Sequence, residues 1–512
     1  MSFPEQINAT TILNRVSCSL SHQGHQGYVV GGFIRDWLLG RQTNDVDIAV
    51  NGNALNIAQQ VAEDLSGKFV LLDEINGIAR VIALEKEQQW HLDFSSFPGN
   101  IKPDLARRDF TVNTMAMELK RFATAVSQSP EYSEEAMKQS QLKLIDPFSG
   151  KKDLENKVLR AVSEQIFEAD AARLLRAVRL AAELNFTIEP KTEGLIRHYS
   201  QSLAKVPGER TREELLRLLS LPQAAQHLRY LDNLGLLSAL VPELAESKGV
   251  EQPTVHFWDV FDHSLQTVAA VEFLMRESDW EHGNEDMLAT VPWSDSIDQH
   301  LSQEVSKGSN HKVLLKLGGL LHDIAKPKTK SVDDTGRAHF LGHPKQGAAM
   351  AASILERLRF SHKEINLVQS LVYHHLRPVQ MANEELPTKR AIYRYFRDTG
   401  DAGPDILLLA LADYLATGGP LVNMRNWKEQ CHLINYILTE HEKQQATILP
   451  VKLIDGHDLI NVFGLTPGPV IGQLLALIHE ARASGELTTK EEALALVHKE
   501  LNKQQCDARP GN

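Results

Sequence analysis

The spacing of apolar residues changes near residue 150, and this change limits the folds open to the chain. Residues 27–120 alternate strand-like runs such as DVDIAV with helix-like runs such as ALNIAQQVAEDLSG, a pattern typical of a small sheet covered by helices. From about residue 150 onward, apolar residues recur almost throughout at helical spacing. The polar segment 277–310 interrupts this pattern and indicates an insertion or a loop. The sequence therefore predicts a multidomain α/β plus α protein, with a mixed-sheet head followed by helical domains.

Length and composition agree with several globular domains in a reducing compartment. The chain has 512 residues, 42% of them hydrophobic and 23% charged, and about 150 residues per domain corresponds to three or four domains. Its three cysteines are far apart and form no C-x-x-C pair, which excludes a disulfide scaffold and a thiolate zinc site. No uncharged apolar run reaches the roughly 18 residues of a membrane span, and the N-terminus lacks a secretory pattern. We therefore expect a cytoplasmic protein that does not enter a membrane.

The charge balance is uneven along the chain. The net charge of −12 does not favour nucleic-acid binding, because phosphate contacts need local positive charge. Residues 151–230, however, hold 14 basic against 11 acidic residues. Solvated helix faces and a polyanion-binding face are both compatible with this local excess.

The segment GGFIRDWLLGRQTNDVDIAV holds the sharpest chemical signal. Gly31 and Gly32 end a strand and open a helix, so that backbone amides could approach a phosphate closely. Arg35 follows one turn later and could neutralise a triphosphate. Asp45 and Asp47 alternate on one strand and therefore face the same side. Two carboxylates on one face, completed by nucleotide phosphates, can hold Mg²⁺.

Two later segments could complete this site. Asp93, in HLDFSSF, lies on a later strand, and a third carboxylate would suit a two-metal mechanism. In LARRDFTVNTMAM, Arg107 and Arg108 suit a triphosphate, while Asp109 and Asn113, one helical turn apart, could bond a ribose or phosphate. The alternatives are a solvated strand end for the carboxylates and a capped helix start for the second segment.

Together these segments resemble the nucleotidyltransferase head of the bacterial tRNA nucleotidyltransferase and poly(A) polymerase family, class II of the polymerase-β-like superfamily. The matching stretches keep the family's order and cover about the first 220 residues: GGFIRDWLLG, NDVDIAV, ARRDFTVNTMA, LIDPFSGKKDLENKVLRAV and DAARLLRAVRLAAELNFTIEP. The resemblance implies transfer of a nucleotide from CTP or ATP to an RNA 3′ end, with tRNA as the favoured acceptor. It implies that Mg²⁺ binds Asp45 and Asp47, with Asp93 as a further catalytic carboxylate. The expected nucleotide-binding residues are Gly31, Gly32, Arg35, Arg107, Arg108, Asp109, Asn113, Asp170, Arg173 and Arg176.

The resemblance also bears on which nucleotide is added. The family reads the incoming base through the Asp and Arg of an E-D-x-x-R helix, and here Ala169, Asp170 and Arg173 stand at these positions. The leading Glu is absent, but Asp170 and Arg173 would lie one turn apart on one helix face. Only thirteen residues separate Asp93 from Arg107, where family members that add all of CCA usually carry a longer flexible loop. We therefore expect partial addition, with CC favoured over A.

A second set of residues occurs in the helical part. His263, the adjacent pair His322 and Asp323, and the distant Asp413 occur in this order, and such a set can surround one divalent metal. With 21 histidines in the chain, any single one is more often a structural residue, but the ordered set is not expected by coincidence.

This set resembles the HD superfamily of metal-dependent phosphohydrolases, over about residues 255–420. The resemblance implies a divalent metal (Mg²⁺, Mn²⁺, Ni²⁺ or Fe²⁺) on His263, His322, Asp323 and Asp413. His343, His374 and, after them, His375 are the candidates for a second ion, and Lys326 is the candidate phosphate contact. The implied activity is that of a phosphodiesterase or phosphatase acting on a nucleotide or a damaged RNA end.

We expect four segments: a nucleotidyltransferase head (1–145), a helical neck and body for base selection and RNA binding (146–254), an HD domain (255–425) and a helical tail (426–512). The expected partners are the tRNA 3′ end and ATP, CTP or both. The alternatives are a poly(A) polymerase acting on other RNAs, an HD phosphohydrolase whose head only binds nucleotide, and an RNA-binding protein without chemistry.

Overall fold

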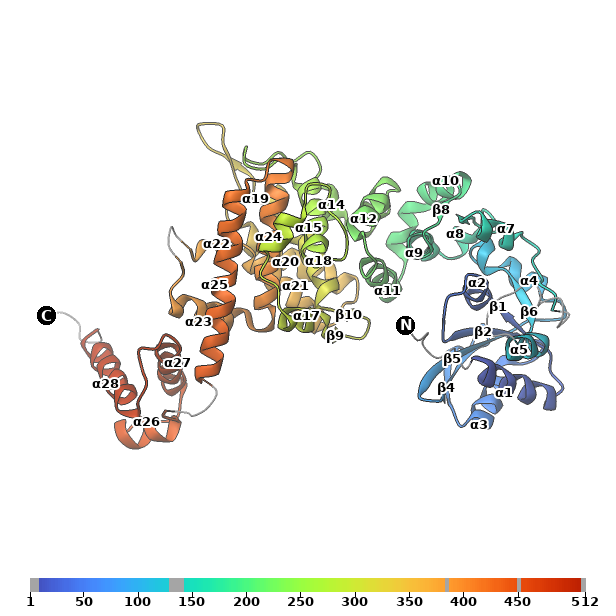
Figure 1. Cartoon of the computed structure of the whole chain (residues 1–512), viewed down its shortest axis with the longest axis horizontal. Helices are drawn as coiled ribbons and strands as arrows, with labels where there is room; N and C mark the ends of the chain where they lie inside the picture. The colour runs from blue at the N-terminus through green and yellow to red at the C-terminus, as the bar shows by residue number, and fades with distance from the viewer. Residues whose placement is uncertain (1–8, 129–141, 383–385, 449–452, 508–512) are drawn as a thin grey trace. The chain divides into compact units, whose positions relative to one another are not determined.

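The computed structural model describes residues 9–128, 142–382, 386–448 and 453–507. The chain divides into two compact units (Figure 1). The first comprises Met1–Val206 with Leu234–Ala239, and the second comprises Pro207–Asn233 with Leu240–Asn512. The division into four segments expected from the sequence is finer than this and stays a prediction.

A six-stranded mixed sheet forms the core of the first unit. Its strands are β1 (Gly27–Val30), β2 (Asp45–Val50), β3 (Lys68–Asp73), β4 (Ile78–Glu85), β5 (Gln88–Ser96) and β6 (Ala116–Glu118). The order is β3-β4-β5-β2-β1-β6, with β2 and β5 parallel and the other neighbours antiparallel. In β2, Val46 and Ile48 are buried, whereas Asp45 and Asp47 point to the opposite face because strand side chains alternate. The mixed-sheet head expected from the sequence is confirmed.

Helices complete the first unit. α1 packs against α3 and α5. α3 begins at Asn53, whose side chain accepts hydrogen bonds from the amides of Leu55 and Asn56, and it ends at Ser66 in the left-handed conformation. The helices and short strands of this unit are α1 (Ala9–His22), α2 (Gly32–Leu38), α3 (Ala54–Leu65), α4 (Lys102–Ala106), η1 (Thr111–Asn113), α5 (Leu119–Gln128), α7 (Gly150–Glu155), β7 (Val158–Leu159), α8 (Ile166–Ala169), α9 (Arg173–Leu184), β8 (Thr187–Ile188), α10 (Pro190–Tyr199), η2 (Ser200–Lys205) and most of α13 (Leu236–Leu240).

The second unit is almost entirely helical. Its centre is built by α15 (Val260–Leu274), α18 (His311–Leu321), α21 (His362–His374) and α24 (Gly403–Gly418), in which α15 and α21 both contact α18 and α24. The remaining elements are α11 (Gly208–Leu219), α12 (Ala224–Asn233), α14 (Pro242–Ala245), α16 (Glu285–Thr290), α17 (Asp295–Ser302), β9 (Glu304–Ser306), β10 (Ser309–Asn310), α19 (Lys326–Thr329), β11 (Ser331–Val332), β12 (Ala338–His339), α20 (His343–Arg357), α22 (Arg377–Gln380), α23 (Lys389–Thr399), η3 (Gly400–Ala402), η4 (Gly419–Leu421), α25 (Met424–Ile448), α26 (Gly456–Phe463), α27 (Pro469–Ala483) and α28 (Lys490–Asp507).

The polar segment 277–310 is not the irregular loop that its composition suggests. It contains α16, α17 and the β9–β10 hairpin. The side chains of Asn284 and Ser294 accept hydrogen bonds from the amides of Met287 and Ile297 at the two helix starts. Ile297 and Leu301 are buried. Buried apolar residues and side-chain hydrogen bonds at the two helix N-termini therefore order this segment, although its overall composition is that of a loop.

The C-terminal helices pack around a small apolar cluster of their own. Leu459, Leu474 and Val497, one from each of α26, α27 and α28, lie in it. Glu480 on α27 is buried and receives Arg390 at 3.1 Å and Arg394 at 2.6 Å from α23, so ion pairs join this cluster to the helices before it. In the part of the chain that the structure describes, no helix is long and apolar enough to cross a membrane.

Candidate functional site

Three carboxylates gather on one face of the head sheet. Asp45 and Asp47 lie on β2, and the parallel register pairs Asp47 with Asp93 of β5. Side chains of paired residues point to the same face, so the three carboxylates expected from the sequence are neighbours. The side chains of Asp45, Asp47 and Asp93 are 72%, 44% and 25% exposed, so the group opens to solvent. Oxygen-only donors of this kind fit a hard divalent cation.

The electrostatics of Asp47 agree with a cation site. Burial raises the pKa of Asp47, and the negative charge of Asp93 adds to this rise, while Arg108 at 3.7 Å opposes it. Asp93 is held by Arg80 through two hydrogen bonds of 2.6 and 2.7 Å. A divalent cation would relieve the repulsion between the carboxylates. Arg80 has no signal in the sequence, because only the β4–β5 register brings it opposite Asp93.

Gly31 is required for a different reason from the one that the sequence suggests. Its amide donates to the carbonyl of Met115 at 3.2 Å, so it is already used and does not face a phosphate. Its φ is +72°, and a Cβ there would lie 2.5 Å from Asp47 Oδ2 and 2.6 Å from Arg108 Nη1. Gly32 begins α2. A side chain at Gly31 would therefore displace the carboxylate of Asp47.

Arg35 is a buried residue. Its guanidinium donates to both carboxylate oxygens of Asp36 at 2.9 and 2.7 Å and to Asn113 Oδ1 at 2.8 Å. The side chain is only 9% exposed. The structure thus places Arg35 behind Asn113, with three of its five N–H groups donating to Asp36 and Asn113. The expected contact of Arg35 with the triphosphate stays a prediction.

The ARRDF segment folds differently from the helix turn that the spacing predicts. Asn113 ends the 3₁₀ helix η1 and Asp109 precedes it, yet Asn113 Nδ2 still donates to Asp109 Oδ1 at 3.0 Å. Arg176 pairs with the other oxygen of Asp109 at 2.8 Å. Burial alone would raise the pKa of Asp109, but Arg176 and the hydrogen bond from Asn113 lower it. Asp109 is therefore ionised, and its carboxylate holds the side-chain amide of Asn113 in place.

The two arginines of this segment share one acidic partner. Asp104 is buried and receives Arg107 at 2.5 Å and Arg108 at 3.3 Å. The Arg107 side chain is 54% exposed, and that of Arg108 is 20% exposed and lies between Asp104 and Asp47. Asp104 is a site neighbour that was not among the expected residues, although its place three and four residues before the arginine pair is a detectable signal.

Asp170 and Arg173 come together, but not on one helix face. Asp170 is the extended residue after α8, and Arg173 opens α9. Their side chains form an ion pair of 3.8 Å, and Arg173 Nη2 also donates to the carbonyl of Arg107 at 3.0 Å. The expected helix breaks here because Asp170 leaves the helical conformation and its side chain accepts from the amide of Ala172.

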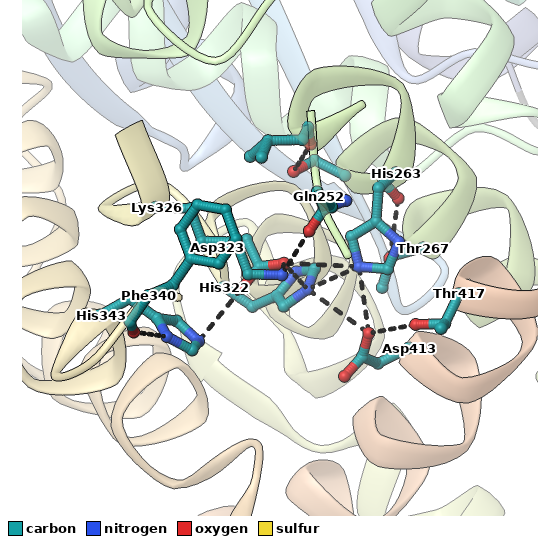
Figure 2. A network of polar contacts seen from close by, with 12 residues as sticks. Gln252, His263, Thr267, His322, Asp323, Lys326, Phe340, His343, Asp413 and Thr417 are labelled. Atoms are coloured by element: carbon teal, nitrogen blue, oxygen red, sulfur yellow. Dashed lines mark hydrogen bonds and ion pairs between the residues drawn. The ribbon is translucent and has the colours of Figure 1, made fainter. Parts of the chain in front are cut away.

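A four-residue metal-type cluster lies in the second unit (Figure 2). His263 Nε2, on α15, lies 3.1 Å from His322 Nε2, 3.0 Å from Asp413 Oδ1 and 3.5 Å from Asp323 Oδ2. His322 follows α18, and Asp413 comes from α24. The buried Asp323 lies 3.1 Å from His322 Nε2 through Oδ2 and 3.3 Å from His343 Nε2 through Oδ1. Imidazole nitrogen atoms gathered around a buried carboxylate fit a divalent metal.

The histidine rings are held in the orientation that ligation needs. The Nδ1 atoms of His322, His343 and His375 lie 2.7 to 2.8 Å from the carbonyls of Gly319, Phe340 and Val372. A carbonyl only accepts, so each Nδ1 carries a proton, and each Nε2 faces the cluster, where a metal would take the place of any proton on it. Burial lowers the pKa of His343 and lowers that of His375 to about 4. Both rings are therefore neutral near pH 7, as a ligand must be.

A second metal-type group shares Asp323 with the first. His343 Nε2 lies 3.3 Å from Asp323 Oδ1 and 3.4 Å from His375 Nε2, which is 3.9 Å from Asp323 Oδ1. His374 is not in the group, and its ring instead contacts Tyr373. The expectation that ranked His374 ahead of His375 is wrong, since adjacent residues of a helical segment point about 100° apart and only one faces the centre.

Lys326 forms an ion pair with Asp323 of the cluster. Its Nζ lies 2.5 Å from Asp323 Oδ2 and donates to Gln252 Oε1 at 2.6 Å, as Figure 2 shows. Burial alone would raise the pKa of Asp323, but His322 and Lys326 hold it well below its usual range. Gln252 carries no sequence signal, because it reaches the cluster only through the fold of the loop before α15.

Family models match the two parts of the chain in which these groups of residues lie. The poly A polymerase head domain model matches residues 27–160, the model described as "Probable RNA and SrmB-binding site of polymerase A" matches 185–248, and the HD domain model matches 260–418. The A-adding tRNA nucleotidyltransferase of Deinococcus radiodurans is 34% identical, covering 92% of this chain and 94% of that protein. The CC-adding tRNA nucleotidyltransferase of Thermus thermophilus is 31% identical, covering 92% of each.

Solved structures show the same fold. The Thermotoga maritima CCA-adding enzyme complexed with tRNA aligns over 97% of both chains with a TM-score of 0.59 and 22% identity. One chain thus combines a polymerase-type group of carboxylates with an HD cluster. This combination defines the class of protein: a nucleotidyltransferase that carries an HD domain. The chain belongs to the tRNA nucleotidyltransferase and poly(A) polymerase family.

Proposed function

We propose that the head adds C or A from CTP or ATP to the 3′ end of tRNA, and that it builds only part of the CCA end. The observation that carries this proposal is the parallel register of Asp47 with Asp93, beside Asp45. Mg²⁺ held by Asp45 and Asp47 would activate the RNA 3′-hydroxyl and balance charge on the departing pyrophosphate. We infer that the protein works in the cytoplasm, where tRNA, CTP and ATP are present.

The side chains around the carboxylates bind and orient the nucleotide. Arg108, between Asp104 and Asp47, faces the triphosphate. Asn113 is oriented from two sides, since Arg35 donates to its oxygen and its nitrogen donates to Asp109. Its amide therefore stays fixed while it bonds the sugar or phosphate, which lowers the entropy cost of positioning.

Base choice rests on Asp170 and Arg173. Asp170 accepts and Arg173 donates, and discrimination arises because a wrong base leaves these groups unpaired. The hydrogen bond from Arg173 to the carbonyl of Arg107 ties the base-reading residues to the ARRDF segment. Because this hydrogen bond restrains Arg173, it supports a preference for one nucleotide rather than a switch between CTP and ATP. Four relatives matched along more than nine-tenths of their length are named A-adding or CC-adding tRNA nucleotidyltransferases, which also supports partial addition.

The test uses three tRNA acceptors, ending before the first C, before the second C, and before the A. Each is incubated with labelled CTP, labelled ATP, or both, and the product length is read on a sequencing gel. We expect either CC added to the first acceptor and a single C to the second, or A added to the third. Addition of C is the outcome expected from the sequence. A complete CCA end on the shortest acceptor would contradict partial addition, and long A tracts on unrelated RNAs would favour a poly(A) polymerase.

For the second unit we propose a metal-dependent phosphohydrolase acting on a nucleotide or a damaged RNA end. The observation that carries this is the convergence of His263, His322, Asp323 and Asp413, with His343 and His375 sharing Asp323. The bound ion, one of Mg²⁺, Mn²⁺, Ni²⁺ or Fe²⁺, would polarise the phosphate and supply an activated water. Lys326 could give up its contact with Asp323 or with Gln252 and bind a phosphate oxygen of the substrate instead.

The hydrolase proposal is tested with the double variant His322→Ala and Asp323→Ala, assayed with each of the four metals on 2′,3′-cyclic, 2′-phosphate and 3′-phosphate RNA ends. We expect hydrolysis to be lost and nucleotide addition to remain within about two-fold, since each group of residues is complete in itself. Absence of hydrolysis by the wild type with every metal would contradict the proposal. A collapse of nucleotide addition in the folded double variant would show that the two activities are coupled.

A further inference from the structure

A third histidine–aspartate cluster lies in the second unit and takes no part in the sites above. It consists of His300 on α17, His311 at the start of α18 and Asp405 in the first turn of α24. His300 Nε2 lies 2.6 Å from Asp405 Oδ2, and His311 Nδ1 lies 3.1 and 3.2 Å from the two oxygens of Asp405. The three ligand atoms all lie within 4.8 Å of one another. Three side chains from three helices thus converge on one point.

The cluster contains a buried carboxylate that two imidazoles contact. The Asp405 side chain is 0% exposed, and within the described ranges its ion pairs are with His300 and His311. Lys312, next in the chain, pairs instead with Asp298 at 3.2 Å. The other titratable groups that act on the cluster, Tyr395 and Asp401, supply no positive charge.

A buried carboxylate is costly unless a cation compensates it. Burial alone would lower the pKa of His300, but its hydrogen bond to Asp405 and the charge of Asp405 raise it, so a Zn²⁺ ion would take the place of a proton on His300. Two imidazole nitrogens and one carboxylate are a three-ligand zinc set that leaves a fourth position for water. The His300 side chain is 17% exposed, so this fourth position can reach solvent at its side of the cluster.

We propose that His300, His311 and Asp405 bind one Zn²⁺ ion at a site separate from the HD cluster. Zinc–ligand distances of about 2.0–2.1 Å in a tetrahedron separate the ligand atoms by about 3.3 Å. The His300–Asp405 contact of 2.6 Å would therefore widen by about 0.7 Å, whereas the His311–Asp405 contacts of 3.1 and 3.2 Å already come close to this separation. The helices themselves can stay in place.

The position of the site points to a structural role for the ion. α18 carries His311 at its start and His322 directly after its end, while α24 carries both Asp405 and Asp413. With a rise of 1.5 Å per residue, the new site lies roughly 12–16 Å along these helices from the HD cluster. Zinc at this point would fasten α17 to both helices. It would thereby hold the helices that present HD ligands in a fixed relative position.

The experiment measures zinc per chain in the full-length protein. Wild type, Asp405→Asn and His300→Gln are stripped with a chelator, reloaded with Zn²⁺ alone, dialysed and analysed for metal content. The same three are made in a chain that also carries His322→Ala and Asp323→Ala, where the HD cluster cannot retain the ion. Asp401→Asn is the matched control, because it removes a nearby acidic charge that is not a ligand.

We expect Asp405→Asn and His300→Gln each to bind one zinc fewer per chain in both backgrounds, and Asp401→Asn to bind as much as its parent. Added Zn²⁺ should raise the melting temperature of the parents but not of the two ligand variants. Co²⁺ in place of Zn²⁺ should give visible absorption bands that disappear in the ligand variants. If Asp405→Asn does not fold, His300→Gln decides, since its side chain is at the exposed side. Equal zinc content in parent and ligand variants would overturn the site, and so would equal loss in Asp401→Asn.

Discussion

Asp47 and Asp93 occupy directly paired positions on the parallel strands β2 and β5, and Arg80 on β4 holds Asp93 through both of its carboxylate oxygens. The pairing places the carboxylate of Asp93, which Arg80 holds, beside the more exposed carboxylate of Asp47. Asp47 keeps a partly solvent-facing side chain next to Arg108. The two carboxylates therefore differ in their freedom to meet a cation, although they come from equivalent positions on neighbouring strands.

The first prediction concerns this carboxylate group. Asp45→Asn and Asp47→Asn should each lower kcat for nucleotide addition by about a thousand-fold or more, because a neutral amide cannot hold Mg²⁺ as a carboxylate does. Radioactive nucleotide incorporation measures the effect, and circular dichroism checks the fold. Asp73→Asn is the control, since Asp73 ends β3 and its carboxylate accepts hydrogen bonds from the backbone and side chain of Asn76. Near wild-type addition by either site variant would contradict the assignment.

The second prediction separates close packing from backbone strain at the glycine turn. Gly31→Ala should lower kcat/KM about a hundred-fold, because the added Cβ would meet Asp47 Oδ2 at 2.5 Å. Gly40→Ala is the matched control: its φ is +67°, close to the +72° of Gly31, but its Cβ would meet nothing within 4 Å. It should cost about 1 kcal/mol of stability and little activity. Steady-state kinetics measure the activity of the two variants, and melting temperatures measure their stability. Equal losses of activity in both variants would show that backbone strain, and not the contact with Asp47, lowers the activity.

The third prediction uses two adjacent histidines. His375→Ala should weaken metal binding at the HD cluster by at least about ten-fold and reduce hydrolysis accordingly, because His375 is 1% exposed and its Nε2 faces Asp323 and His343. His374→Ala should leave both within about two-fold. Isothermal titration with Mn²⁺ and hydrolysis of a chromogenic phosphodiester measure them. If His374→Ala were the more damaging change, the ligand assignment would be reversed.

The fourth prediction concerns pH and a buried ion pair. Glu364, in the first turn of α21, is fully buried and receives Arg212 at 2.6 Å. Burial alone would raise the pKa of Glu364, but Arg212, Ser309 and Ser361 lower it. A lowered folded-state pKa means that the stabilisation is present above the ordinary glutamate pKa of about 4.3 and is lost as pH falls through the folded value.

Glu364→Gln should therefore lower the free energy of unfolding of the second unit by about 3 kcal/mol at pH 7, and the gap from wild type should narrow below about pH 4. Hydrogen exchange followed by mass spectrometry reports this unit within the full chain. Glu243→Gln is the comparison, because the partner of Glu243, Arg357, is 45% exposed. That variant should cost no more than about 1 kcal/mol. A gap that widens toward low pH would contradict a lowered pKa of Glu364 in the folded protein.

Local patterns are enough to predict several elements. The alternation in DVDIAV predicts β2 with Asp45 and Asp47 on one face, and β2 spans Asp45–Val50. The change to helical spacing near residue 150 predicts a helical second part, which the structure contains. Segment 277–310 is predicted to be an insertion or a loop, and the loop is wrong, because the segment contains two capped helices despite its polar composition.

The sequence by itself determined the residue types and the order in which they occur, and with them the fold class and the family. Only the tertiary structure decided which of these residues meet. Strand register places Asp93 beside Asp47 and Arg80 against Asp93, and helix rotation turns His375 toward the metal-type group while His374 points away. Packing buries Arg35 behind Asn113. The physical reason is that periodicity along a chain sets the face of each element, whereas register and rotation depend on packing between elements distant in sequence.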